Sequence, residues 1–246
     1  MRKHPRNYKL DHHIKTRSSP VKLSEELVTT VHSYGLDLRS NHIYLISSDM
    51  YNVGVGGTET DEPGVEFTMA NQFIKNLNLC MRLNRKPILV HMNIPGGFWE
   101  SGMAIYDAIK ACPNPVTVLT YSHARSMSSL ILQAANKKVM MPHAYFMFHE
   151  GSLGVEGTNK QVKSYVKFAK TFDVEALNIY ATAMRERGRL KDRSLTYLKR
   201  WLQNGMDKTE EVYLSAQQAV ELGLADEVFD YDWSSLTTYT DQQLRR

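Results

Sequence analysis

The chain has 246 residues, of which 42% are hydrophobic and 23% are charged, and its formal net charge is +4. This is the composition of an ordinary globular protein with a buried core, and it argues against an intrinsically disordered chain. No apolar run is long enough to cross a bilayer and no secretory signal is recognisable, so we expect a cytoplasmic protein with no membrane partner. Cys80 and Cys112 lack metal-ligand spacing, and we expect reduced thiols and no metal site.

The first 22 residues are strongly basic. They contain seven lysines and arginines and a single acidic residue, Asp11, with no regular spacing of apolar residues. We expect a disordered arm at residues 1–22, and its lack of interleaved aromatic residues argues against nucleic acid as a partner. An organellar transit peptide is an alternative for this segment. Residues 233–246 are expected to form a tail outside the main domain, which spans residues 23–232.

Residues 24 to 64 predict a helix, a strand and a loop. Ser24 is a plausible cap for a helix that begins Glu-Glu-Leu-Val, and His42-Ile-Tyr-Leu-Ile-Ser reads as a short strand. Residues 52–64 are rich in glycine and acids, which predicts a loop insertion. This loop lacks the Gly-Lys-Ser/Thr ending of a nucleotide-binding loop, so we expect no nucleotide and no other cofactor.

From residue 67 onward, helical and extended patterns alternate. The helices are predicted at residues 67–83, 99–109 and 126–135, and the strands at 87–92, 115–121 and 144–148. Strands that alternate with helices at this spacing indicate an α/β domain whose mainly parallel sheet is buried on both faces.

Three further helices are predicted in the last third of the chain. Residues 159–187 form one long helical pattern, and its apolar side calls for a packing partner. A second helix is predicted from about Thr196 to Leu202. Residues 213–226 read as a strand, a serine-capped helix and a glycine that ends this helix.

Ser126 is the first candidate for chemistry. It follows the predicted strand 115–121 and a short connection, and it opens an apolar helix. Its hydroxyl would lie at the mouth of that helix beside the N–H of Met127, which is the arrangement of a nucleophile elbow. An ordinary helix cap is the alternative role for this serine.

Two more candidates also follow predicted strands, where α/β folds build their sites. Gly96 and Gly97 come directly after the strand 87–92, and glycines allow the backbone to approach a ligand closely. A simple tight turn is the alternative for this pair. His149 ends the strand 144–148, so it is either a general base or an edge residue with no chemical role.

Four segments together carry a recognisable pattern. They are Asn93-Ile-Pro-Gly-Gly97 with the helix that follows it, His123-Ala-Arg-Ser-Met127, Met147-Phe-His-Glu-Gly151, and the block that runs from Glu211-Val-Tyr-Leu-Ser to Asp226. In order and in spacing these segments resemble the ClpP family of serine peptidases, over roughly residues 38–230.

The resemblance implies an α/β fold of the ClpP/crotonase-like ββα superhelix type, with a long handle helix at about 159–187 and a carboxyl-terminal strand-helix block. It implies an acyl-enzyme mechanism in which Ser126 is the nucleophile, His149 the general base and Glu211 the carboxylate that orients the histidine. The backbone N–H groups of Gly97 and Met127 would form the oxyanion hole. The substrate-binding positions that it implies are Gly96, Gly151, Ser152 and Leu153.

The resemblance also implies partners. The substrate would be an unfolded polypeptide or a short peptide. The chain would form a homo-oligomer, as heptameric rings stacked into a double ring, and a Clp-type AAA+ ATPase is a candidate partner.

Some residues depart from the family pattern. The third member of the triad is usually Asp, whereas this chain has Glu211, with Asp207 as the nearest alternative carboxylate and Glu210 as a weaker one. Arg125 stands directly before the nucleophile in place of a small residue. These departures leave three alternatives open: a catalytically impaired subunit of the same fold, a phage head-maturation protease, and a crotonase-type enzyme acting on acyl-coenzyme A.

Overall fold

The computed structural model describes residues 25–46 and 64–245. The predicted basic arm at 1–22, the expected cap Ser24 and nearly all of the loop insertion 52–64 lie outside the described residues. The described chain is built around two sheets, one of six strands in the order β1-β2-β3-β4-β6-β9 and one of three strands in the order β5-β7-β8.

The six-stranded sheet is the centre of the molecule. Its strands are β1 (Leu36–Asp37), β2 (His42–Ile46), β3 (Ile88–Asn93), β4 (Val116–Thr120), β6 (Lys137–Met140) and β9 (Glu227–Val228). Every pairing is parallel except that of β1 with β2. All five residues of β4 are buried, as are the first five of β3, which is typical of strands covered on both faces. The predicted mainly parallel sheet is confirmed.

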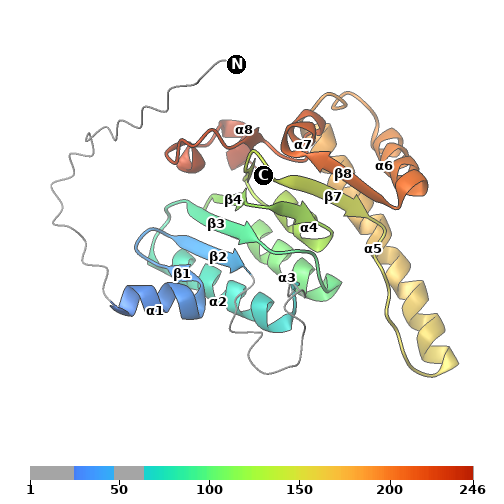
Figure 1. The fold of residues 1–246 in the computed structure, drawn as a ribbon, viewed down its shortest axis with the longest axis horizontal. Helices are drawn as coiled ribbons and strands as arrows, with labels where there is room; N and C mark the ends of the chain where they lie inside the picture. The colour runs from blue at the N-terminus through green and yellow to red at the C-terminus, as the bar shows by residue number, and fades with distance from the viewer. Residues whose placement is uncertain (1–24, 47–63, 246) are drawn as a thin grey trace, which may run out of the picture.

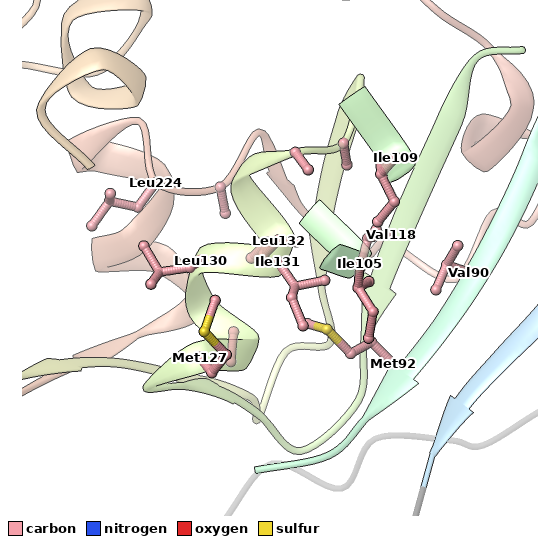
Figure 2. Close-up of a cluster of buried hydrophobic side chains, with 14 of the residues drawn as sticks. Val90, Met92, Ile105, Ile109, Val118, Met127, Leu130, Ile131, Leu132 and Leu224 are labelled. Atoms are coloured by element: carbon pink, nitrogen blue, oxygen red, sulfur yellow. The ribbon is translucent and has the colours of Figure 1, made fainter. Parts of the chain in front are cut away.

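Helices cover one face of this sheet (Figure 1). They are α1 (Glu25–Tyr34), α2 (Phe67–Leu83), α3 (Trp99–Lys110) and α4 (Met127–Gln133). Figure 2 shows how Val90 and Val118 of the sheet face Ile105 and Ile109 of α3, and Ile131 of α4 belongs to the same buried cluster. Burial of such side chains contributes about 1.5–3 kcal/mol each, and it fixes the start of α4 against the end of β3.

The C-terminal segment covers the opposite face of the large sheet (Figure 1). Phe229 and Leu236 form a second, smaller core with Leu89, Leu119 and Val139. The segment includes the short helices η2 (Ser235–Thr237) and α8 (Asp241–Leu244). Hydrogen bonds tie it down, because the Thr117 hydroxyl donates to the carbonyl of Leu236 at 2.6 Å.

The second, three-stranded sheet was not predicted, because the sequence indicated a single mainly parallel sheet. It consists of β5 (His123–Arg125), β7 (Tyr145–His149) and β8 (Glu211–Ser215), and β5 pairs in parallel with β7. The sequence analysis treated residues 122–125 as a connection, which is wrong, since a three-residue strand is too short to show a period. This strand carries the chain from the large sheet to the start of α4.

Three more helices complete the fold: α5 (Asn159–Glu186), α6 (Leu195–Thr209) and the shorter α7 (Ala216–Leu222). The first half of α5 projects away from the rest of the molecule (Figure 1) and exposes Val166 and Phe168, whereas its second half buries Ile179, Tyr180 and Met184. The helix α6 continues to Thr209, beyond the predicted end at Leu202. Ser215 caps α7 and Gly223 ends it in a left-handed conformation, as predicted.

His91 is a buried base within the large sheet. The residue is 5% exposed, and its ring stacks on Tyr44 with centroids 4.6 Å apart and hydrogen-bonds the Tyr121 hydroxyl at 2.8 Å. Burial, together with the neighbouring His42, lowers the pKa of His91 from 6.5 to about 4. The unfolded chain therefore binds a proton that the folded chain excludes between these two pH values.

The expected result is a loss of stability on acidification. The contribution of His91 is fully present above pH 6.5 and falls as the pH drops toward 4, by up to about 3 kcal/mol. Urea unfolding at pH 7.5 and pH 4.5 measures this loss, and His91→Gln should show a smaller one because glutamine binds no proton. An equal pH dependence in both proteins would contradict this explanation.

Candidate active site

Ser126 occupies a sharp turn between β5 and α4. Its backbone angles are φ 52° and ψ −127°, a positive φ that a residue with a side chain rarely adopts. Although Ser126 stands at the cap position of α4, its side chain makes no capping hydrogen bond. The alternative of an ordinary helix cap is therefore wrong. Strain of this kind at a strand-to-helix turn is typical of a nucleophile elbow.

The Ser126 hydroxyl instead meets His149. The distance from His149 Nε2 to Ser126 Oγ is 2.8 Å, within hydrogen-bonding range. His149 is the last residue of β7, and the N–H of Ser126 donates to the carbonyl of Met147 on the same strand at 3.0 Å. The pairing of β5 with β7 thus places the serine beside the histidine, although 23 residues separate them in sequence.

Gly96 allows the backbone to approach the serine closely. A Cβ atom at Gly96 would lie 2.4 Å from Cβ of Ser126, 2.6 Å from its Oγ and 3.0 Å from the nitrogen of Met127. No side chain fits in that space. The close approach therefore explains why a glycine stands here, and the alternative of a simple tight turn does not account for it.

Gly97 and Met127 are the expected residues of the oxyanion hole. Val65 pairs with the segment around Gly97, since its N–H donates to the Gly96 carbonyl and its carbonyl accepts from the N–H of Phe98, both at 2.9 Å. Neither bond uses the N–H of Gly97. The N–H of Met127 lies in the first turn of α4, where amides lack a partner within the helix. Gly97, Ser126 and Met127 line one cavity.

Glu211 lies across from His149 on the neighbouring strand. The two residues are direct partners in the antiparallel register of β7 and β8, so their side chains leave the same face of the small sheet. Within the described residues no hydrogen bond joins them. The Glu211 carboxylate accepts a hydrogen bond from the Tyr213 hydroxyl at 2.6 Å, and this bond raises the pKa of Tyr213.

The two alternative carboxylates, Asp207 and Glu210, lie at the C-terminal end of α6. Asp207 accepts a hydrogen bond from the Gln203 amide at 3.1 Å, and the same amide donates to Glu150 at 2.6 Å, which makes an exposed network on α6. Glu210 ends α6 and is exposed. Neither residue has a hydrogen bond to His149 among those the described structure contains.

A cavity of about 230 Å³ opens beside the serine. The expected substrate-binding residues Gly151, Ser152 and Leu153 line one side of it, and α5 lines the other. Most of the α5 wall is apolar or aromatic: Tyr165, Ala169, Phe172, Ala176 and Tyr180.

Asp173 of α5 is also part of this wall, and the sequence analysis missed it. Its carboxylate accepts a hydrogen bond from the N–H of Gly151. Burial and the nearby Glu150 raise the pKa of Asp173 above its usual value, against the opposing effect of that hydrogen bond. The available signal was an acidic residue between the apolar positions Phe172 and Ala176 of the long helix.

No cluster of three metal-ligating side chains occurs within residues 25–46 and 64–245. In the same ranges, none of the helices has the length and the hydropathy required to traverse a bilayer.

Comparison with known proteins gives a consistent family. The model of the Clp protease family matches residues 61–232. The ATP-dependent Clp protease proteolytic subunit of Chlorella vulgaris is 32% identical over 171 residues, which cover 68% of this chain and 79% of that protein. The protein of the same name from Deinococcus radiodurans is 29% identical over 171 residues, 68% of this chain and 76% of its own.

A solved structure also shares the fold. A mutant of ClpP1 from Listeria monocytogenes superposes with a TM-score of 0.59 at 17% sequence identity, covering 84% of this chain and 96% of that one. The family model covers well over half of the chain and includes every candidate site residue. The chain therefore belongs to the Clp protease family, with a divergent ClpP-type fold.

Proposed function

We propose that the chain is a serine endopeptidase subunit that hydrolyses unfolded polypeptides or short peptides through an acyl-enzyme. The observation that supports this most strongly is the 2.8 Å contact between Ser126 Oγ and His149 Nε2 at a strained strand-to-helix turn. A nucleophile and a base within hydrogen-bond reach are the minimum requirement for this chemistry. Membership of the Clp protease family makes a peptide bond the expected target.

The mechanism assigns one role to each group. His149 Nε2 accepts the proton of the Ser126 hydroxyl while Oγ attacks the carbonyl carbon of the substrate. The negative charge that develops on the carbonyl oxygen is stabilised by the N–H groups of Gly97 and Met127. The tetrahedral intermediate then collapses, and the leaving amine takes the proton from His149. Water, activated by the same imidazole, hydrolyses the ester and restores Ser126.

Backbone pairing would hold the substrate in place. Residues 151–156 belong to no helix or strand and are exposed. Their peptide groups are thus accessible, and an extended polypeptide could pair with this segment as one strand pairs with another. Gly151, Ser152 and Leu153 line the cavity beside Ser126, so a polypeptide bound there would present its carbonyl to the serine.

Glu211 is the proposed orienting carboxylate, because the strand register places it opposite His149. Glu211→Gln is expected to lower kcat by on the order of 10² to 10⁴, since a neutral amide no longer stabilises the imidazolium. Asp207→Asn serves as the matched control and should leave kcat within twofold. The reverse result, in which only Asp207→Asn lowers kcat, would assign the carboxylate to α6 instead.

Tyr213 bears on a second candidate function, a catalytically impaired subunit. In the structure Tyr213, and not His149, hydrogen-bonds the Glu211 carboxylate. Tyr213→Phe removes this competing bond, so an active enzyme should keep or gain turnover. Absence of turnover in both proteins, with normal assembly, would favour the impaired subunit.

Assembly into rings is the remaining part of the proposal. The projecting half of α5 exposes Val166 and Phe168, apolar side chains that a second copy would bury. We propose heptameric rings stacked as a double ring, with a Clp-type AAA+ ATPase as a candidate partner; a cytoplasmic location stays a prediction. Negative-stain imaging tests the rings, and a monomer or trimer would contradict them.

Hydrolysis of short fluorogenic peptides by the purified full chain tests the activity itself. Turnover that disappears when Ser126 is replaced supports the peptidase. Binding of acyl-coenzyme A by calorimetry, with no peptide turnover, would instead support the crotonase-type alternative.

A further inference from the structure

Among its described lining residues, the cavity beside Ser126 has carboxylates and no lysine or arginine. Two carboxylates line it, those of Glu100 and Asp173, while His149 is its only other titratable group apart from tyrosines within the described lining. The remaining wall is largely apolar or aromatic. A peptidase cavity next to the nucleophile receives the side chain of the substrate residue whose carbonyl is attacked, here called the primary side chain. The charge of the wall therefore bears on which primary side chain fits.

Asp173 stands where it can reach that side chain. It lies on α5 between Ala169 and Ala176, at spacings of four and three residues, so the three share one face of the helix. All three line the cavity. The two alanines leave room around the carboxylate, because a methyl group is the smallest side chain that a helix favours.

An aromatic wall borders the same space. The ring of Phe172 stacks on Trp99, with centroids 4.8 Å apart and planes 10° from parallel. Met127 and Leu130 of α4 and Tyr180 of α5 complete the apolar lining. Such walls suit the methylene stem of a long side chain, while a charged head continues to a polar group at the end.

The charge of Asp173 has no cationic partner among the described residues. Its one assigned hydrogen bond comes from the N–H of Gly151, which leaves acceptor capacity on the carboxylate. The nearby Glu150 adds negative potential and no compensation. An incoming lysine or arginine side chain would supply the missing positive charge, and a charge-assisted hydrogen bond would hold it.

We propose that Asp173 is a specificity-determining residue that selects substrates with a lysine or arginine primary side chain. The proposal rests on the proposed peptidase function. The stem of the basic side chain lies between Phe172 and the α4 residues, and its head binds the Asp173 carboxylate. Glu100, exposed at the mouth of the cavity, adds attraction for the same charge.

Peptide substrates that differ only at the primary side chain test this selectivity. Lysine and norleucine share the same four-carbon stem, so the ratio of their kcat/KM values isolates the charge. The wild-type chain should favour lysine, and Asp173→Asn should lower the ratio by about tenfold. Asparagine keeps the shape of the residue and can still accept the bond from Gly151. Glu175→Gln, an exposed carboxylate of the same helix, is the matched control and should leave the ratio unchanged.

A second measurement does not need turnover. Peptidyl diphenyl phosphonates with a basic or a norleucine-like primary group react with an activated serine, and intact mass records the rate. The basic probe should label the wild type faster, and Asp173→Lys should reverse this order. If norleucine is preferred by the wild type, or if Asp173→Asn leaves the ratio unchanged, the selectivity is overturned while the peptidase stands. If neither peptide cleavage nor labelling of Ser126 occurs, both proposals fail.

Discussion

Replacing Ser126 by alanine is expected to lower peptide hydrolysis by on the order of 10⁶ in kcat while leaving the fold intact. The reason is that the attacking atom is lost, and within the described residues the Ser126 hydroxyl is the one that hydrogen-bonds His149. The hydroxyl makes no capping bond in α4, so its removal costs little stability. Steady-state hydrolysis of a fluorogenic peptide, together with urea unfolding of both proteins, measures the two effects separately.

Ser194→Ala is a suitable control for this substitution. Ser194 is exposed, caps α6 and is not among the residues that line the cavity. Its replacement should cost about 1 kcal/mol of stability with no change in kcat. Residual activity of Ser126→Ala within tenfold of the wild type would show that another nucleophile performs the reaction.

Gly96→Ala should also inactivate the enzyme, although Gly96 supplies no reactive group. The added methyl carbon would lie 2.4 Å from Cβ of Ser126 and 2.6 Å from its Oγ, which forces the two turns apart. A displacement of about 1 Å between nucleophile and base costs on the order of 10²-fold in rate or more. The same measurement of kcat/KM detects this loss.

Gly205→Ala provides the matched glycine control. A Cβ there meets only a methyl group of Val212 at 3.3 Å, and Gly205 lies within α6, where alanine is favoured. We expect unchanged activity and equal or higher stability. If Gly96→Ala retained activity within twofold of the wild type, the close packing of the two turns would not be needed for catalysis.

Helices and strands with a clear pattern of apolar residues were predictable from the sequence. The helix at Phe67–Leu83 has the predicted bounds, and β3 and β4 appear as buried apolar runs near their expected places. The strand β5 was missed because three residues cannot show alternation. The end of α6 was missed because its last turns, from Gln203 to Thr209, are mostly polar and exposed.

The candidate site was likewise predictable only in part from the sequence. Ser126 was named from its place at the start of a predicted helix and His149 from its place at the end of a predicted strand, and in the structure Ser126 Oγ and His149 Nε2 are 2.8 Å apart. The contact itself depends on the pairing of β5 with β7, which no local pattern reveals. Asp173 and the partner of Glu211, Tyr213, were missed, since both depend on which helix face or strand neighbour meets the cavity.

The reactivity of the Ser126 hydroxyl tests its role as the nucleophile most directly. Treatment of the full chain with a fluorophosphonate, followed by intact mass and peptide mapping, should give a single adduct on Ser126, slowed strongly by His149→Gln and absent in Ser126→Ala. An unlabelled wild-type protein, or equal labelling after Ser126→Ala, would contradict the assignment of Ser126 and His149 as nucleophile and base.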